Sequence, residues 1–246
     1  MAKRTINGFT RQQEAAIIRN NIDALTRKYA PAFQKEIIRA TREGAKLYEE
    51  NLSVDLLLAK HQNKIDRILT SLWIESSQNI RQILSRRKDD RFIMGIVEFI
   101  KIYGVTKVTE ITFTTVKNIK DAISKGIKEG LGIAETAREI RKNAPEISKI
   151  RSNTIARTEI HQASNTANMQ LTKELANELG IEMVKEWVGS HDERVRDTHA
   201  EADRQTVGLN ENFIVGGEEL AYPGDPNGSA ENVINCRCAV VSVPKE

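Results

Sequence analysis

The segment Trp187–His199 (WVGSHDERVRDTH) and the closing segment Asn235–Cys238 (NCRC) decide how this chain is expected to fold. Together they hold both cysteines and two of the four histidines of the 246-residue chain. Cysteine and histidine are scarce in this chain, so their grouping in two short segments is not expected by chance. We therefore expect Cys236, Cys238 and His199 to meet in the folded protein.

These side chains offer three of the four ligands of a tetrahedral zinc ion, and His191 or Asp192 offers the fourth. A Cys-x-Cys spacing is less common in structural zinc sites than Cys-x2-Cys. The sequence leaves a second interpretation equally open, in which the thiols are simply buried and the histidine lines a small domain. If a metal binds, a closed cysteine-rich site favours a role in folding over catalysis.

The same region can also be interpreted as acid–base apparatus. His191, Asp192 and His199 resemble the groups of a metal-dependent nuclease or a toxin-like enzyme. However, Asp192 and Glu193 followed by Arg194 are typical of the start of a helix, where carboxylates face the positive end of the dipole. We favour the structural interpretation, and no phosphate-binding glycine loop supports nucleotide hydrolysis.

Before residue 180 the chain is predicted to be mostly helical. Thr10 and Gln13 form a capping box, and Pro31 is expected to end or kink the first helix or to begin the next. Apolar residues then recur at helical spacing, and Gly180 is well placed to cap the last helix. The predicted N-terminal helices are one at 10–29 with its continuation past 31, one at 52–84 and one at 92–103 up to Gly104. A strand or helix follows at 105–115, and a helix begins at Val116 and ends at Gly130 or Gly132. A short helix at 133–141, stopped at 143–145, and a long helix at 148–179 complete this part.

After Gly180 the pattern changes to strands and turns. Residues 181–188 and 238–243 are predicted strands that pair with each other. Between them lie a short helix at 193–203, a hairpin-like region at 206–222 and a loop at 222–228. The predicted fold class is α+β, with a mostly helical N-terminal region at 1–147 and a compact α+β domain with a short antiparallel sheet at 148–246.

Composition indicates a globular protein with an uneven charge distribution. Hydrophobic residues make up 39% and charged residues 29% of the chain, and no stretch approaches the length of a membrane span. Because no signal peptide follows Met1, we expect synthesis in the cytoplasm and reduced thiols. Residues 1–180 carry 31 Lys and Arg against 21 Asp and Glu, a net charge of +10, whereas residues 181–246 carry 6 against 13, a net charge of −7.

This asymmetry favours contact between the N-terminal region and nucleic acid or an acidic partner. The simpler explanation, which we place somewhat ahead, is that long solvated helices carry many basic residues. The basic triplet Arg86–Lys88 is interpreted in the same way, as part of a charged connector at 86–91 that faces water.

An ordered set of residues resembles the tailed-phage minor head protein family related to the Mu F protein. As a set it is specific and spans about half of the chain. Its members here are Gly130–Ala137, Ile155–Glu159 with Arg157, Thr158 and Glu159, Asn165, Trp187, Asp192–Arg196 with Arg194, His199, Phe213, Tyr222–Asp225 with Pro223, and Asn235–Cys238 with Arg237. Some members have Cys-Pro-x-Cys at 196–199, so Arg196 stands where their first cysteine would be, and a fourth metal ligand must come from elsewhere.

The resemblance implies a structural component of the virion that acts in procapsid assembly and head morphogenesis. It implies a low-copy protein inside the capsid near the portal vertex, with the portal protein as partner. Scaffold or major capsid protein and double-stranded DNA are further expected partners, with a role in DNA packaging or ejection, and no membrane contact is expected during assembly. It further implies no enzymatic activity and no toxin domain, since six residues follow Val240. A host nucleic-acid-binding protein that uses residues 1–180 is the third alternative.

Overall fold

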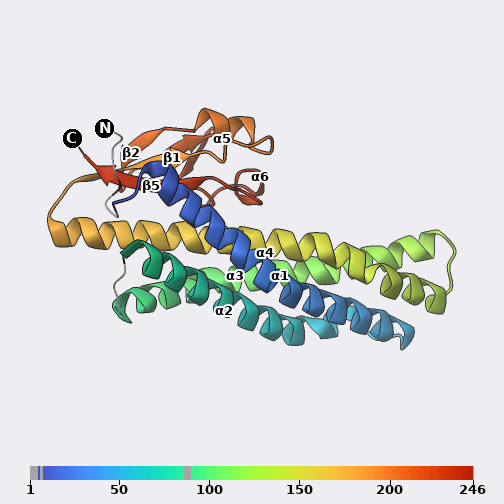
Figure 1. Cartoon of the computed structure of the whole chain (residues 1–246). Coiled ribbons are helices and arrows are strands. Elements are labelled where there is room, and N and C mark those ends of the chain that lie inside the picture. The colour runs from blue at the N-terminus through green and yellow to red at the C-terminus, as the bar shows by residue number, and fades with distance from the viewer. Residues whose placement is uncertain (1–4, 6–7, 86–89, 246) are drawn as a thin grey trace. The chain divides into compact units, whose positions relative to one another are not determined.

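Long helices dominate the chain before residue 180, and a small sheet follows them (Figure 1). The computed structural model describes residue 5, residues 8–85 and residues 90–245. The predicted α+β fold class is confirmed. Of the charged connector predicted at 86–91, residues 86–89 lie outside the described part. The long elements are α1 (Arg11–Glu49), the 3-10 turn η1 (Val54–Leu57), α2 (Leu58–Ser85), α3 (Asp90–Lys128) and α4 (Ile133–Leu179).

Two helix ends follow the predicted capping chemistry. The backbone N–H of Thr10 donates to Gln13 Oε1 at 2.9 Å, and the N–H of Gln13 donates to Thr10 Oγ1 at 3.2 Å, so the predicted capping box begins α1. At the end of α4, Gly180 adopts a left-handed conformation with φ 64°. This conformation lets the N–H of Ile181 donate to the carbonyl oxygen of Ala176 at 3.1 Å, which closes the last turn.

The segment 105–115, which the sequence left open between strand and helix, is helical and lies inside α3. Gly104 therefore does not end a helix, contrary to the prediction. The hydroxyl groups of Thr109, Thr114 and Thr115 each donate to the carbonyl oxygen four residues earlier, at 2.8, 2.7 and 2.9 Å. Because these bonds remain inside the helix, the β-branched residues are accommodated without a strand partner.

Two prolines lie inside helices and not at helix ends. Pro31 lies inside α1, and Pro145 lies inside α4, so the predicted stop at 143–145 is wrong and the segments 133–141 and 148–179 are one helix. A proline in a helix interior costs about 3 kcal/mol. Neighbouring side chains offset this cost by packing, since Phe33 and Ala144 are fully buried. The hydroxyl of Ser148 also donates to the Pro145 carbonyl at 2.9 Å.

The chain divides into two compact units. One, the helical unit, consists of residues 27–72 and 98–156, and the other, the sheet unit, consists of the described residues of 1–26 and 73–97 together with 157–245. Position 147 falls within α4. The predicted division into two domains, 1–147 and 148–246, would therefore cut α4, and it stays a prediction.

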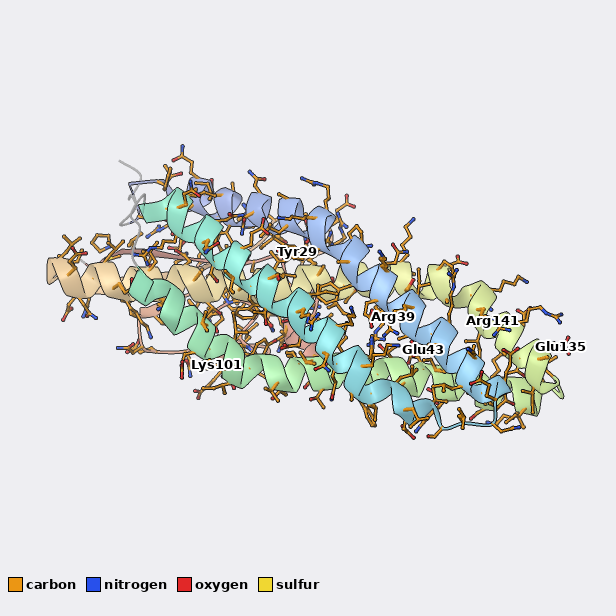
Figure 2. The ribbon with its side chains drawn as sticks, turned by 90° about the horizontal axis from the view of Figure 1, so that it is seen from below. Tyr29, Arg39, Glu43, Lys101, Glu135 and Arg141 are labelled. Atoms are coloured by element: carbon orange, nitrogen blue, oxygen red, sulfur yellow. The ribbon has the colours of Figure 1, made fainter. Side chains whose placement is uncertain are left out.

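The helical unit combines an apolar core with a buried ion cluster. Its core contains Leu57, Ile119 and Ile140, each at least 90% buried. Glu36 accepts hydrogen bonds from Arg39 Nη2 at 2.6 Å and lies 2.9 Å from Nδ1 of the fully buried His61. Arg39 also pairs with Glu43, one turn further along α1 (Figure 2).

Three strands form the sheet of the sheet unit. The central strand β1 (Met183–Val188) pairs in antiparallel fashion with β2 (Thr206–Gly208) on one edge and with β5 (Ala239–Pro244) on the other. Trp187 lies opposite Val240, so the predicted pairing of these two segments is confirmed. The core on this sheet contains Trp187, Phe213, Leu220 and Val240, all fully buried.

The remaining elements of the sheet unit are short. β3 (Phe213–Val215) and β4 (Glu218–Leu220) form the predicted hairpin. The helix predicted at 193–203 is reduced to α5 (Asp197–Glu201), because Asp192 accepts the backbone N–H of Arg194 at 3.0 Å and holds a turn there. A further short helix, α6 (Ala230–Val233), precedes the closing segment.

The Glu36 cluster generates a prediction about acid stability. Burial alone would raise the pKa of Glu36, but hydrogen bonds from Arg39 and His61 outweigh burial and lower this pKa to about 2. Because the pKa is lowered in the folded state, the stabilisation is present above pH 4.5, its ordinary value, and is lost as the pH falls towards 2. We expect Glu36→Gln to reduce the free energy of unfolding by about 2–3 kcal/mol at pH 7 and by much less near pH 2.5, measured by urea denaturation.

Glu50, the residue directly after α1, provides the matched control. It is exposed and pairs with Lys46 at 3.6 Å, and surface pairs of this kind contribute about 0–1 kcal/mol. Glu50→Gln should therefore leave the unfolding free energy nearly unchanged at both pH values. Equal losses for the two variants, or a Glu36→Gln loss that does not depend on pH, would contradict the assignment.

Candidate metal centre

His199, Cys236 and Cys238 meet in the sheet unit, as the sequence predicted. His199 lies in α5, and the cysteines lie in the segment that leads into β5. The ligand atoms of the three residues all lie within 4.8 Å of one another, and each residue is 1% exposed. His199 Nδ1 lies 3.6 Å from Sγ of Cys236 and 3.5 Å from Sγ of Cys238.

An aromatic wall fixes the orientation of His199. The indole ring of Trp187 meets the imidazole edge to face, with 5.4 Å between ring centroids, and Phe213 packs against the same indole at 5.5 Å. Both aromatic residues are fully buried. Because water is excluded from this wall, a bound ion would satisfy the polar atoms of the cluster at little cost in lost hydration.

The distances in the cluster fit a tetrahedral zinc ion. Zinc binds thiolate sulfur at about 2.3 Å and imidazole nitrogen at about 2.0–2.1 Å, so two such ligands at the tetrahedral angle lie about 3.6 Å apart. The observed nitrogen–sulfur distances are 3.6 and 3.5 Å. The donor set of two thiols and one imidazole is also the chemistry that zinc prefers.

The two thiols differ in acidity. A hydrogen bond from Cys236 lowers the pKa of Cys238 to about 5, and His199 contributes in the same direction. Burial raises the pKa of Cys236 well above its ordinary value. Cys238 is therefore the sulfur that carries negative charge most readily.

The structure places His191 and Asp192 outside this cluster. His191 Nε2 lies 2.8 Å from Asp203 Oδ2, on a backbone turned by a positive φ of 53°. Asp192 pairs with Arg237 at 2.7 Å, and the exposed Arg194 contributes its backbone N–H to the same carboxylate. The sequence offered His191 or Asp192 as the fourth metal ligand. In the structure His191 is paired with Asp203, and Asp192 is paired with Arg237.

A second polar group, which sequence reasoning missed, binds the free edge of β5. His161 Nε2 lies 2.7 Å from the carbonyl oxygen of Cys238, Asn165 Oδ1 accepts the N–H of Val240 at 3.1 Å, and Asn168 Nδ2 donates to the Val240 carbonyl at 2.8 Å. We call His161, Asn165 and Asn168 the α4 clamp. Figure 1 shows the C-terminal half of α4 running along the sheet. The spacing i, i+4, i+7 of polar residues on one helix face was the available signal.

The neighbouring residues Arg157, Thr158 and Glu159 have different roles. Thr158 Oγ1 accepts the backbone N–H of Asn235 at 3.1 Å, which ties α4 to the cysteine segment. Glu159 accepts the indole N–H of Trp73 at 3.2 Å. The sequence predicted that a buried Arg157 or Glu159 would find its partner in the C-terminal domain. One partner of Glu159, Trp73, comes from α2, and Arg157 is partly exposed.

The loop at 222–228 closes over His161. Pro223 and Gly224 are buried, and Thr166 donates to the hydroxyl of Tyr222 at 3.0 Å. Gly224 has φ 80°, and a Cβ atom there would lie 2.4 Å from His161 Nδ1. Burial lowers the pKa of His161 to about 4, so its imidazole is neutral at pH 7. Only glycine satisfies both the backbone conformation and the space beside this ring.

The family described as "Phage Mu protein F like protein" matches residues 117–241, which include the cysteine–histidine cluster and the α4 clamp. Two curated proteins are also similar to the chain. It is 32% identical to the minor head protein GP7 of Bacillus phage SPP1 over 52% of this chain and 41% of that protein. It is 31% identical to the NAD(+)--arginine ADP-ribosyltransferase EFV of Enterococcus faecalis over 70% of this chain and 35% of that protein.

The chain therefore spans between 35% and 41% of the length of these relatives. No solved structure matches it.

Gly224→Ala is expected to destabilise the sheet unit by about 3 kcal/mol. The left-handed backbone costs about 1–2 kcal/mol for alanine, and displacement of the His161 ring weakens its bond to Cys238, a buried contact worth about 1–3 kcal/mol. Thermal and urea unfolding of the full chain would measure the change.

Gly217→Ala is the matched control, because Gly217 has φ 83° but nothing lies within 4 Å of its Cβ position. It should show the backbone cost alone. If the two variants unfold alike, His161 does not need the space beside Gly224.

Proposed function

Because the chain belongs to the Phage Mu protein F like family, we propose that it is a minor head protein that acts in head morphogenesis at the portal vertex of a tailed bacteriophage. The family match carries this proposal, since it covers residues 117–241 and includes the whole candidate metal centre. Similarity to the minor head protein of phage SPP1 supports the same role. In this role the protein is an architectural component of the procapsid rather than a catalyst.

The helical region is proposed as the contact surface for other head components. Residues 1–180 carry the net charge of +10 derived from 31 basic and 21 acidic residues. A surface of this sign attracts an acidic protein face or DNA over distances of about 8–10 Å at ordinary salt. The portal protein is the proposed main partner, with scaffold, major capsid protein and double-stranded DNA as further contacts during packaging or ejection.

The metal centre has a structural role in this proposal. His199, Cys236 and Cys238 would hold one zinc ion, which would cross-link α5 to the start of β5. The α4 clamp acts on the same strand, because its members bind the backbone of Cys238 and Val240. The sheet has three short strands, and domains with cores this small are commonly supplemented by a metal.

Burial of the cluster argues against its use as an enzyme active site. A general base must lie within reach of a substrate proton, but His199 is 1% exposed and is enclosed by Trp187. The ADP-ribosyltransferase relative is matched over 35% of its own length, so most of that protein lies outside the match. These two observations favour a structural role over the nuclease or toxin-like alternative.

The proposed location is the interior of the virion near the portal, after synthesis in the host cytoplasm. Among the described helices, none has the length and apolarity needed to cross a bilayer.

Zinc binding is tested by elemental analysis and thermal unfolding. We expect about one zinc ion per chain. Zinc at a thousandfold excess over its dissociation constant stabilises the folded state by about 4 kcal/mol, which corresponds to about 8–16 °C in Tm for a chain of this size. The double variant Cys236→Ser/Cys238→Ser should lose both the zinc and this increment in Tm.

His191→Asn is the control, since His191 pairs with Asp203 and not with the cysteines. It should keep the zinc. A wild-type protein that binds no zinc, or whose Tm in excess zinc equals that of the double serine variant, would show that a thiol-bound zinc ion does not stabilise the fold.

Portal binding is tested by co-expressing the tagged full chain with the portal protein of the same phage. We expect the two to elute together at 100 mM salt and to separate as salt rises, since the proposed contact involves unlike charges screened by salt. Treatment with nuclease during purification controls for bridging by DNA. Absence of co-elution at every salt concentration would reject the portal assignment, and retention that nuclease abolishes would favour direct DNA binding.

A further inference from the structure

The helical unit contains a cavity of about 250 Å³ between α1, α3 and α4. This volume corresponds to about eight water-sized groups. Apolar side chains form much of its wall: Ile37, Ile119, Ala122, Leu131, Ile140 and Ala144. A ligand for this space must therefore be small and largely apolar.

The residues that line the cavity extend along two helices. On α4 its lining runs from Thr136 to Arg151, about 22 Å along the helix axis, and on α3 it runs from Thr115 to Gly126, about 16 Å. The spread of the lining along both helices, with apolar side chains between, suits an extended aliphatic chain.

One end of the cavity carries a partly buried guanidinium group. Arg151 donates from Nη1 to Thr115 Oγ1 and from Nη2 to the carbonyl oxygen of Ile111, both at 2.7 Å. These acceptors are neutral, and within the described part of the chain no carboxylate lies within ion-pair distance of Arg151. Burial lowers the pKa of Arg151 to about 10, with no opposing contribution from an acidic group. A desolvated cation without a counter-ion favours binding of an anion.

The other charged groups of the lining already have partners. Lys125 lies 3.8 Å from Glu129, and Glu139 lies 3.7 Å from Lys142. These four side chains are all at least 44% exposed, so they face solvent. Arg151 is therefore the group in the lining best placed to select the charge of a ligand.

Thr136 lies in the part of the lining away from Arg151. Its hydroxyl is buried, and no partner for it is found among the described residues. A Cβ atom on Gly126 would lie 2.5 Å from that hydroxyl, so α3 and α4 approach closely here. This close approach leaves no space for a ligand between Gly126 and Thr136.

We propose that the helical unit binds an aliphatic monocarboxylate of about 8–12 carbons, with its carboxylate on Arg151 and its chain along the apolar wall of the cavity. One guanidinium matches one carboxylate in charge and in geometry, because both groups are planar and form paired hydrogen bonds. The inference concerns α1, α3 and α4 of the helical unit and does not depend on the metal centre or on the proposed portal contact.

Calorimetric titration of the full chain with sodium hexanoate, sodium decanoate and decanol tests the site. Each added methylene group should tighten binding about fourfold until the cavity is filled, so decanoate should bind more tightly than hexanoate. Decanol, which lacks the charge, should bind about 10- to 100-fold more weakly than decanoate. Absence of decanoate binding, or equal binding of decanol, would overturn the proposal.

Arg151→Gln should weaken decanoate binding about 10- to 100-fold, whereas Lys149→Gln, an exposed position on the same helix, should leave it unchanged. Equal effects of the two variants would overturn the assignment of Arg151.

Ala122→Leu is a second test of the site, for use if Arg151→Gln fails to fold, because this substitution leaves Arg151 and its hydrogen bonds intact. Ala122 lies about 10 Å along α3 from Thr115, so the larger side chain should block decanoate and still admit hexanoate. Decanoate binding unchanged by Ala122→Leu would show that the chain does not lie in this cavity.

Discussion

The sheet unit depends on the hydrogen bonds that α4 makes to the edge of β5 that has no partner strand. A buried strand edge must have its N–H and C=O groups bonded, since each unpaired group costs about 1–3 kcal/mol. In this sheet β5 pairs with β1 on one side only, and the α4 clamp bonds its other side. Side chains of a helix thus take the place of a fourth strand, which protects the edge from pairing with another chain.

This arrangement explains the unusual composition of α4 between residues 158 and 172. Nearly every side chain there is buried, although many are polar. Asn21 donates to the hydroxyl of Ser164 at 3.1 Å, and Ser164 lies 2.9 Å from Ser76. A helix with a polar face on a strand and another polar face on neighbouring helices needs small hydrogen-bonding side chains, because larger apolar ones would leave backbone groups unpaired.

The clamp and the metal centre act on the same few atoms. The carbonyl of Cys238 is bound by His161, while its thiol faces His199. His161 is in turn covered by Gly224. A disturbance at any of these positions is therefore transmitted to the start of β5. The helical unit depends instead on the packing of its helices around the cluster of Glu36, Arg39 and His61. Its side chains leave the cavity between α1, α3 and α4 unfilled.

The sequence by itself determined the features that arise from chemistry over a few residues. The capping box at Thr10, the left-handed Gly180, the strand that contains Trp187 and the gathering of Cys236 with His199 could all be predicted. Capping needs only neighbouring residues, and apolar periodicity shows which face is buried. The grouping of scarce ligands and the ordered family residues indicated the region of the site before any contact was known.

Only the tertiary structure decided which long-range contacts outweigh local preferences. Pro145 lies inside a helix because packing of its neighbour Ala144 offsets the local cost, and a local pattern contains no measure of packing. In the same way, the structure decided that His191 binds Asp203 and that Asn165 serves β5, 75 residues away in the chain. A side chain's partner depends on which segments the fold brings together, and that is a property of the whole chain.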